Sequence, residues 1–291
     1  MVAVKALACE LPTKADPPQP LARWQGPDLA RAAVESGIVA SISGTTIWRW
    51  LSSDAIKPWQ HRSWIFPRDP DFGATAARVL DLYGRRFNDT PLRPDEYVIS
   101  ADEKTSIQAR IRKHATTGPA PRRPLRVEAE YVRGGSLAYL AAWDVHHAKV
   151  FGRCEAATGI DPFNRLIDQV MTSQPYASAR RVFWVVDNGS SHRGQPSSDR
   201  LQHRWPTLRL IHLPVHASWL NQVEIYFSVV QRKVLAPHDF HTLNEVESRL
   251  LDFQQHYEQI ATPFEWKFTK DDLNALLERV ATHDADRTLA A

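Results

Sequence analysis

Two aspartates follow apolar segments directly, at positions where a side chain is displayed and not buried. Asp187 comes after the continuous apolar run 182–186 and before Asn188-Gly189, a pair that lets the chain turn sharply. Asp102 follows the mostly apolar segment 97–101. An uninterrupted apolar strand belongs in the middle of a sheet covered on both faces, and ligands of open α/β sheets gather where such strands end. We therefore expect both carboxylates at one edge of a sheet.

A third carboxylate, Glu224, comes from the segment 218–234, which repeats apolar residues at helical spacing. Leu220 lies four positions before Glu224, and Phe227 lies three positions after it. Glu224 is therefore expected on the flank of the buried face. An ionised carboxylate there is costly to desolvate unless a cation or a donor meets it.

Three carboxylates that converge repel one another, so one of them takes up a proton unless a divalent cation neutralises them. Mg²⁺ is the expected cofactor, because it binds carboxylate oxygens, keeps several waters and completes its shell with phosphate oxygens. Two such ions about 4 Å apart activate an attacking oxygen and stabilise a leaving one. The chemistry predicted for Asp102, Asp187 and Glu224 is phosphoryl transfer, with a nucleic acid as the source of the phosphate.

Acids stand at strand ends in any α/β protein, so other residues stay in question. Asp144 also follows an apolar run and is a candidate. Glu103 follows Asp102, but the two-residue period of a strand points it to the opposite face. His192 is expected to contact a phosphate or to orient a water near Asp187, and a loop-capping histidine is the alternative.

The basic residues are unevenly distributed. Residues 104–133 contain eight basic and two acidic residues, a local net charge of +6, whereas residues 234–291 carry −6 in a chain of net charge +3. Such asymmetry fits a face made for a polyanion, although a charge run is also typical of a solvated surface. The Pro-rich loop 114–126 lies in this region. The expected phosphate contacts are Arg110, Arg112, Lys113, Arg122 and Arg123.

The N-terminal region contains two predicted short helices around a tight turn. The first, residues 27–36, carries Val34 on its apolar face, and the second, residues 44–56, has Thr45 or Thr46 as its expected cap. This is the outline of a helix-turn-helix, whose second helix enters the DNA major groove, and a plain helical hairpin is the alternative. The expected DNA contacts here are Thr45, Trp48, Arg49, Lys57, His61 and Arg62.

The rest of the chain alternates strands with helices. Strands are expected at 97–102, 106–111, 136–145, 149–154, 181–187 and 208–213, and helices at 161–171, 195–204 and 218–234. The order favours an α/β fold, a mixed sheet with helices on both faces. The predicted domains are a DNA-binding region at 1–66, a helical linker at 67–96 and a catalytic domain at 97–291 that ends in helices.

Composition excludes several classes of protein. The 291 residues are 43% hydrophobic, enough for a core, and no apolar run approaches the ~18 residues of a membrane span. Cys9 and Cys154 are far apart and belong to no C-x-x-C pair, which argues against a disulfide framework and a zinc ribbon. We expect a cytoplasmic protein with no membrane partner.

Three segments are distinctive: VISADEKTSIQAR at 98–110, VFWVVDNGSSHRG at 182–194 and PVHASWLNQVEIYFSVVQRK at 214–233. They resemble the catalytic blocks of the bacterial insertion-sequence transposases of family 630, a branch of the mariner-like superfamily of DDE transposases. The 36 residues between Asp187 and Glu224 are close to the short spacing of that group. PFEWKFT, residues 263–269, is similar to its C-terminal block.

The resemblance implies a ribonuclease H-like domain in which Asp102, Asp187 and Glu224 are the first, second and third catalytic acids and bind Mg²⁺ or Mn²⁺. It implies cut-and-paste transposition, in which water cuts a phosphodiester at the element end and the freed 3′-hydroxyl attacks target DNA at a TA step. The implied partners are double-stranded DNA, as terminal inverted repeats and target, and a second copy of the chain in a dimeric complex.

Members of the family usually carry two helical DNA-binding modules, and residues 1–66 have room for about one, so an incomplete set is expected. Two other functions stay open. A ribonuclease H-like nuclease would cut without joining, and a catalytically silent regulator derived from a transposase would bind DNA without cutting. Three intact acids that repel one another argue against the silent regulator.

Overall fold

The computed structural model describes residues 1–60, 67, 69–237 and 239–289. Its contacts divide the chain into two compact units, Met1–Ile65 and Phe66–Ala291, each with its own apolar core. His61 and Arg62, two of the expected DNA contacts, lie outside the described residues.

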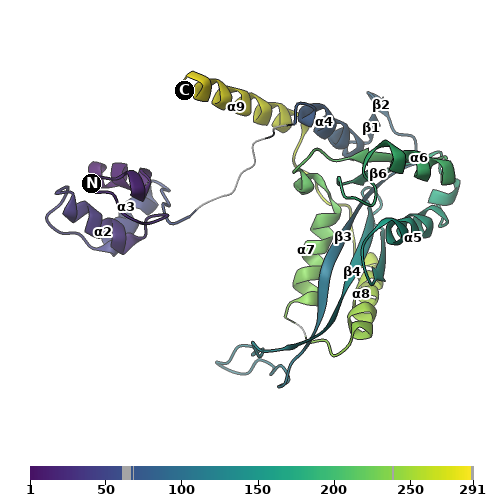
Figure 1. Ribbon diagram of the computed structural model, residues 1–291, viewed down its shortest axis with the longest axis horizontal. Coiled ribbons are helices and arrows are strands. Elements are labelled where there is room, and N and C mark those ends of the chain that lie inside the picture. The colour runs from purple at the N-terminus through teal and green to yellow at the C-terminus, as the bar shows by residue number, and fades with distance from the viewer. Residues whose placement is uncertain (61–66, 68, 238, 290–291) are drawn as a thin grey trace. The chain divides into compact units, whose positions relative to one another are not determined.

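The first unit packs three α-helices around one core (Figure 1). Its elements are α1 (Val2–Cys9), the short 3₁₀ helix η1 (Pro12–Lys14), α2 (Gly26–Glu35) and α3 (Gly44–Ser53). The predicted helix pair is present as α2 and α3, and Leu29, Ile47 and Leu51 are completely buried between the helices. The sequence analysis did not predict α1, which packs against both other helices.

Two details of the predicted helix pair are wrong. The cap of α3 is Ser43, whose hydroxyl accepts a hydrogen bond from the Thr46 N–H at 3.1 Å, because Thr45 and Thr46 already lie inside the first turn. Val34 is 40% exposed, whereas Ala33 beside it is completely buried. The buried face of α2 is turned away from Val34 because α2 packs against α1 as well as α3.

The second unit is built on a five-stranded mixed sheet of order β5-β4-β3-β6-β7. The strands are β3 (Glu96–Ile111), β4 (Val132–Asp144), β5 (Val150–Glu155), β6 (Arg181–Val186) and β7 (Leu208–His212). β4 pairs antiparallel with β3 and β5, and β6 pairs parallel with β3 and β7. The predicted ribonuclease H-like mixed sheet is confirmed. A separate small hairpin is formed by β1 (Arg86–Phe87) and β2 (Thr90–Pro91).

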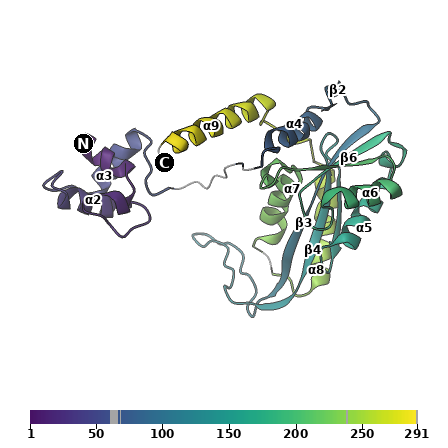
Figure 2. The same cartoon turned by 45° about the horizontal axis from the view of Figure 1, so that its top comes forward.

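The two predicted strands 97–102 and 106–111 are one continuous strand, β3. Lys104 pairs with Tyr139 and Ile107 pairs with Leu137, so two residues of β3 lie opposite one residue of β4 in a β-bulge. The polar residues in the bulge look like a turn in the sequence, but they interrupt the ladder without ending it. β3 and β4 thus form a long ribbon that extends beyond the other strands (Figures 1 and 2).

Helices cover both faces of the sheet, as predicted. One face is covered by α5 (Ile160–Met171), α6 (Gly194–Arg204) and the 3₁₀ helix η2 (Tyr176–Ser178). The other face is covered by α4 (Phe72–Tyr83), α7 (Val223–Val230) and α8 (Leu243–Glu258), and α9 (Lys270–Leu289) packs against α4. In the described part of the chain, no helix is long and apolar enough to cross a membrane.

The segment 67–96, expected as a linker, packs into the core of the second unit. Val79 and Leu82 of α4 are completely buried in the same cluster as Val98 and Phe183 of the sheet. The apolar face of α4 needs this partner, because an isolated helix of 12 residues is only marginally stable in water.

The predicted helix 218–234 is interrupted. It consists of the 3₁₀ turn η3 (Ser218–Leu220), then α7, then a π-helical turn, η4 (Gln231–Leu235). Asn221 stands in the interruption with an extended backbone. As a result Glu224 lies in the first turn of α7 and not in the middle of a long helix.

Candidate active site

Asp102 and Asp187 are brought side by side by two neighbouring parallel strands. In the register of β3 and β6, Ser100 lies opposite Val185, and each aspartate follows two residues later in its own chain. The pairing therefore places the two carboxylates at the same level of the sheet, with Asp187 just after the carboxyl end of β6 and Asp102 within β3, which continues to Ile111. The prediction that each aspartate stands at the end of its strand is confirmed for Asp187 and wrong for Asp102, because β3 continues to pair with β4 beyond this point.

The Asp102 carboxylate is half-buried and held at both oxygens. Oδ1 accepts a hydrogen bond from the Glu103 N–H at 2.7 Å, and Oδ2 accepts one from Asn221 Nδ2 at 3.0 Å. Burial raises the pKa of Asp102 to about 7, and the negative charges of Asp187 and Glu224 also raise it. The hydrogen bond from the Glu103 N–H lowers the pKa but does not cancel the rise. Asp102 therefore senses both other acids of the predicted triad.

Asp187 lies in the loop after β6, and its side chain is 44% exposed. Its Oδ1 accepts a hydrogen bond from the Gly189 N–H at 2.8 Å and lies 3.2 Å from Nε2 of His192. A Cβ at Gly189 would lie 2.9 Å from that oxygen and 3.2 Å from Nε2 of His192. Glycine is thus needed here because the turn packs its backbone against the carboxylate.

His192, expected to contact DNA or to orient water, is only 1% exposed, so its side chain has no access to a phosphate. Its ring packs on Phe163 with centroids 4.6 Å apart. Burial lowers the pKa of His192 to about 4, and the nearby Asp187 carboxylate only partly opposes this, so the ring is neutral near pH 7. His192 supports Asp187 from inside the protein.

Glu224 is exposed at the start of α7. Partial desolvation raises its pKa, the charge of Lys104 opposes this rise, and the charge of Asp187 adds to it. Glu224 therefore lies within electrostatic reach of the second acid and of a lysine on β3. The exposure leaves its carboxylate free to move towards a cation.

A buried hydrogen-bond chain joins the start of α7 to β3. Asn221, 1% exposed, donates from Nδ2 to the Ala101 carbonyl at 3.1 Å and to Asp102, and its Oδ1 accepts from the Ser100 hydroxyl. The Ser100 oxygen in turn accepts from the Val223 N–H at 2.9 Å. The helix that carries Glu224 is thereby tied to the strand that carries Asp102. In the sequence, the only sign of this hydrogen-bond network is the polar Asn221 within the apolar pattern of 218–234.

The other candidate acids have different surroundings. Asp144 is completely buried and accepts hydrogen bonds from the Tyr176 hydroxyl at 2.7 Å and the His146 N–H at 3.0 Å, so its oxygens stabilise a turn. Glu103 accepts a hydrogen bond from the Ser191 hydroxyl at 3.1 Å, and burial raises its pKa. Its side chain lies on the face opposite that of Asp102, where the strand period placed it.

The donor set suits a hard divalent cation, because it consists of carboxylate oxygens. Among the described residues, no three His, Cys, Asp or Glu side chains are close enough together to form a closed ligand shell. Burial is the largest cause of the raised pKa of Asp102, and the negative charges of Asp187 and Glu224 raise it further. This is unrelieved repulsion of the kind that a cation removes, so Asp102, Asp187 and Glu224 fit such an ion.

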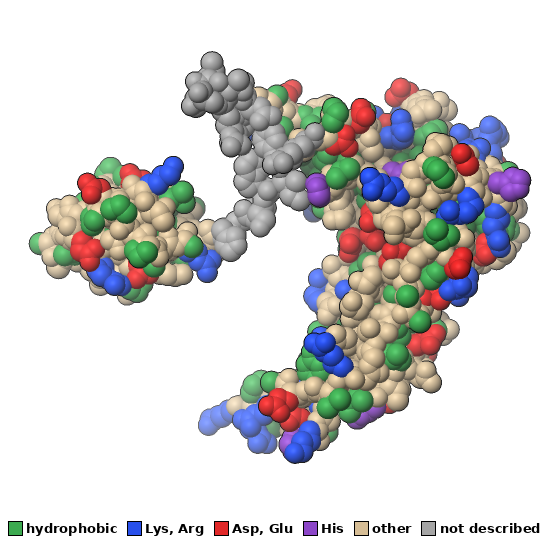
Figure 3. Space-filling view, viewed as in Figure 1, with side chains coloured by type: hydrophobic (Ala, Val, Ile, Leu, Met, Phe, Trp, Pro, Cys, Tyr) green, Lys and Arg blue, Asp and Glu red, His purple; other side chains and the backbone are tan. Residues whose placement is uncertain are grey.

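The expected phosphate contacts in the basic region fall into two groups. Arg112 is 8% exposed, pairs with Asp239 and donates to the Glu128 carbonyl, so it fixes the base of the 112–131 loop and is not available to DNA. The others are exposed, and Figure 3 shows Lys and Arg side chains on the tip of this loop. The exposed members are Arg110, Lys113, Arg122 and Arg123.

In the first unit the expected contacts Thr45, Trp48, Arg49 and Lys57 are all exposed. Trp48, on α3, has 57% of its surface exposed, which is unusual for so large an apolar side chain. It lines an open hollow of about 600 Å³ together with Thr45 and Trp59. Gly26 and Gly44 meet at its floor, where a Cβ on Gly44 would lie 3.1 Å from the Gly26 carbonyl carbon.

A mixed sheet that sets two aspartates level on adjacent strands, with a glutamate on a later helix, is the arrangement expected of an enzyme of the DDE class. The sequence profile of the DDE superfamily endonucleases matches residues 97–247, just over half of the chain. The chain belongs to this family. The resemblance to DDE enzymes is thus confirmed, whereas membership of the bacterial family 630 stays a prediction. Among curated proteins, no sequence matches the chain.

Solved structures of a mariner transposase are similar in fold. The Mos1 mariner paired end complex with Mn matches with a TM-score of 0.54 and 16% identity, over 89% of this chain and 72% of that chain. A pre-cleavage Mos1 transpososome gives 0.53 and 15%, over 98% and 78%. The Mos1 strand transfer complex gives 0.53 and 16%, over 96% and 75%. At such identities the likeness shows that the fold is shared.

Proposed function

We propose that this protein is a transposase that cuts DNA at the ends of a mobile element and joins the freed ends to target DNA. The observation that carries the proposal is the register of β3 and β6, which sets Asp102 and Asp187 level on adjacent strands, with Glu224 near enough to interact electrostatically with both. Family membership supports an endonuclease. The Mos1 structures of the same fold include a strand transfer complex, which supports joining as well as cutting.

Asp102, Asp187 and Glu224 are proposed to hold two Mg²⁺ or Mn²⁺ ions. Mos1 complexes with Mn and with Mg are known for that protein. When bound, the ions supply Lewis-acid stabilisation of the attacking and leaving oxygens of a phosphodiester.

The residues of this chain would position those three carboxylates. Asn221 holds Asp102 by its amide hydrogens and so favours the ionised carboxylate that a cation requires. The Gly189 N–H and the neutral His192 fix the orientation of Asp187. In the described part of the chain, no hydrogen bond or ion pair holds the exposed Glu224 carboxylate, so we infer that it completes the ligand set last.

The partner is proposed to be double-stranded DNA, as terminal inverted repeats and as target. Exposed Trp48 and Arg49 on α3 support recognition of the ends, and exposed Arg122 and Arg123 support contacts to phosphates. Joining two ends requires two active sites, so we propose that the working complex is a homodimer. The Mos1 structures of this fold include a paired end complex of that protein.

The test is cleavage and joining of a labelled duplex taken from the DNA that flanks the gene, in Mg²⁺ or Mn²⁺. Wild type is compared with Asp187→Ala and with Asp199→Ala, a control that removes an exposed carboxylate on α6. Metal-dependent joined products that vanish only in Asp187→Ala support a transposase. Cut but unjoined products would favour a nuclease. Equal binding of the duplex without cutting by any of the three proteins would favour a silent regulator.

A further inference from the structure

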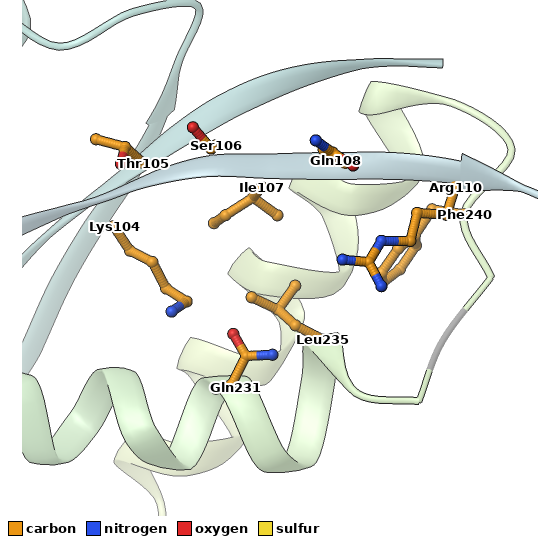
Figure 4. Close-up of a pocket in the computed structure, with 9 residues that line it drawn as sticks. All are labelled: Lys104, Thr105, Ser106, Ile107, Gln108, Arg110, Gln231, Leu235 and Phe240. Atoms are coloured by element: carbon orange, nitrogen blue, oxygen red, sulfur yellow. The ribbon is translucent and has the colours of Figure 1, made fainter. Parts of the chain in front are cut away.

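A small cavity lies between β3 and the turn that follows α7 (Figure 4). Its volume is about 90 Å³, well below the roughly 300–1,000 Å³ of pockets that hold drug-sized ligands. The polar residues that line it are Lys104, Thr105, Ser106, Gln108 and Arg110 from β3 and Gln231 from η4. A cavity of this size with cationic and amide donors suits one small anion.

Both walls of the cavity have irregular backbones. On the β3 side, the bulge between Lys104 and Ile107 includes Ser106, whose φ is +58°. On the helix side, α7 changes to the π-helical turn Gln231–Leu235. Bulges that redirect side chains and π-helical turns are both less favourable than regular structure and are both enriched at functional sites. Their coincidence at one cavity indicates that its shape is used.

The charge in the cavity is positive, and the Glu224 carboxylate, which interacts electrostatically with Lys104, does not form an ion pair with it. Among the described residues, neither Lys104 nor Arg110 forms an ion pair. The Arg110 guanidinium lies 5.1 Å above the Tyr131 ring, and in Figure 4 the Lys104 side chain points towards Gln231. An ammonium and an amide that face one space can both donate to one anion.

The cavity continues the surface that carries the first and third acids. Lys104 follows Asp102 by two residues, so strand alternation points both to the same face, about 7 Å apart along β3. Gln231 follows Glu224 by seven residues, two helical turns and about 10 Å along the axis. Because phosphates of one DNA strand rise about 3.4 Å per nucleotide, this offset corresponds to roughly two or three nucleotides.

We propose that this cavity, the Lys104 pocket, binds one backbone phosphate of the DNA strand whose cleavage site lies at Asp102, two or three nucleotides away. Lys104 supplies the charge and Gln231 a neutral donor. The proposal rests on the proposed function, because it assumes that a DNA strand enters the site. It adds a contact that holds the strand in register with the carboxylates.

The test combines a substitution in the protein with a neutralised phosphate in the DNA. Binding of the full chain to the labelled end duplex is measured as a function of NaCl for wild type, Lys104→Gln, Lys104→Arg and Lys267→Gln. The last removes the same charge from a side chain that is 81% exposed on the surface. Each protein is also titrated with duplexes that carry a single uncharged methylphosphonate at successive positions along the cut strand.

Lys104→Gln is expected to reduce the slope of log K against log salt by about 1, while Lys267→Gln leaves it unchanged and Lys104→Arg restores it. A methylphosphonate two or three nucleotides from the cut should weaken DNA binding by wild type. The same methylphosphonate should not further weaken DNA binding by Lys104→Gln, which has already lost the contact. If the losses of affinity caused by Lys104→Gln and by the methylphosphonate multiply at every position, the two changes act independently and the pocket does not bind a phosphate. Thermal melting of Lys104→Gln at the wild-type temperature establishes that the variant is folded.

The two proposals fail separately in this design. Suppose that Lys104→Gln and the methylphosphonate are coupled in DNA binding, but wild type does not cut the duplex in Mg²⁺ or Mn²⁺. This result overturns the proposed reaction and keeps the phosphate site. A duplex that wild type cuts and joins, with independent losses at every position, overturns the phosphate site and keeps the reaction.

Discussion

Asn221 donates a 3.0 Å hydrogen bond from Nδ2 to Oδ2 of Asp102, and it does so from the interruption between η3 and α7. Its Oδ1 is occupied by the Ser100 hydroxyl, so its amide cannot turn around without losing both bonds. One buried side chain therefore sets the orientation of the first acid and the starting point of the helix that carries the third. Two parts of the site that are 122 residues apart in the chain, Asp102 and Glu224, depend on it.

Asn221→Asp is expected to abolish metal-dependent cleavage, because it places a second carboxylate against Asp102 with almost no change of shape. Mn²⁺ affinity, measured by calorimetric titration, should fall along with activity. Asn244→Asp, the same exchange at an exposed position of α8, should leave both unchanged. Asn221→Ala should lower the free energy of unfolding by about 1–3 kcal/mol, since buried polar groups lose their partner. Wild-type Mn²⁺ affinity in Asn221→Asp would contradict this assignment.

Gly189→Ala is expected to reduce activity about tenfold or more while the fold stays intact. The new Cβ would lie 2.9 Å from Oδ1 of Asp187, so the carboxylate must shift, and a misplacement of about 1 Å can cost ~100-fold in rate. The unfolding free energy should stay within ~1 kcal/mol of wild type, because the backbone at this glycine suits alanine. Gly118→Ala, where a Cβ meets nothing within 4 Å, is the matched control. Equal turnover by the two variants would refute the role of Gly189.

Substitution of Arg112 is expected to affect protein stability, whereas substitution of Arg122 is expected to affect DNA binding. Arg112→Ala removes the partner of the largely buried Asp239 and should lower the unfolding free energy by about 3 kcal/mol. Arg122→Ala, at an exposed position of the same loop, should leave stability unchanged and reduce the salt slope of DNA binding by about 1. Urea unfolding and salt-dependent binding of both variants check this, and the reverse pattern would show that Arg112 is the DNA contact.

Glu96 is expected to make the stability of the second unit depend on acid pH. It is 1% exposed, and although burial opposes ionisation, hydrogen bonds from the Arg93 N–H at 2.9 Å and from Arg181 hold the pKa of Glu96 below its usual value. The unfolded-state pKa is about 4.3, so this contribution is complete above that pH and is lost as the pH falls through the lower folded-state pKa.

In urea unfolding between pH 3 and pH 7, wild type should therefore lose stability on the acid side. Glu96→Gln should be less stable than wild type at pH 7 and should show a shallower loss on acidification. If the unfolding free energies of the two proteins fall in parallel with pH, groups other than Glu96 cause the loss of stability in acid.

The sequence by itself determined the class of fold and indicated three candidate acids, because both depend on local patterns. Buried apolar runs that end in Asp102 and Asp187, and a helical repeat around Glu224, are readable one segment at a time. The exposed basic loop was readable in the same way. The family profile then confirmed the class.

Only the tertiary structure decided which polar side chains pair with residues far away in the sequence. Whether Arg112 faces DNA or Asp239, and whether His192 faces solvent or Asp187, depends on residues brought together from far along the chain. The same holds for the bulge that keeps β3 continuous, which exists because β4 continues the ladder beyond it. Local propensity cannot supply these pairings, since their free energy comes from burial and hydrogen bonds that form only when the sheet is assembled.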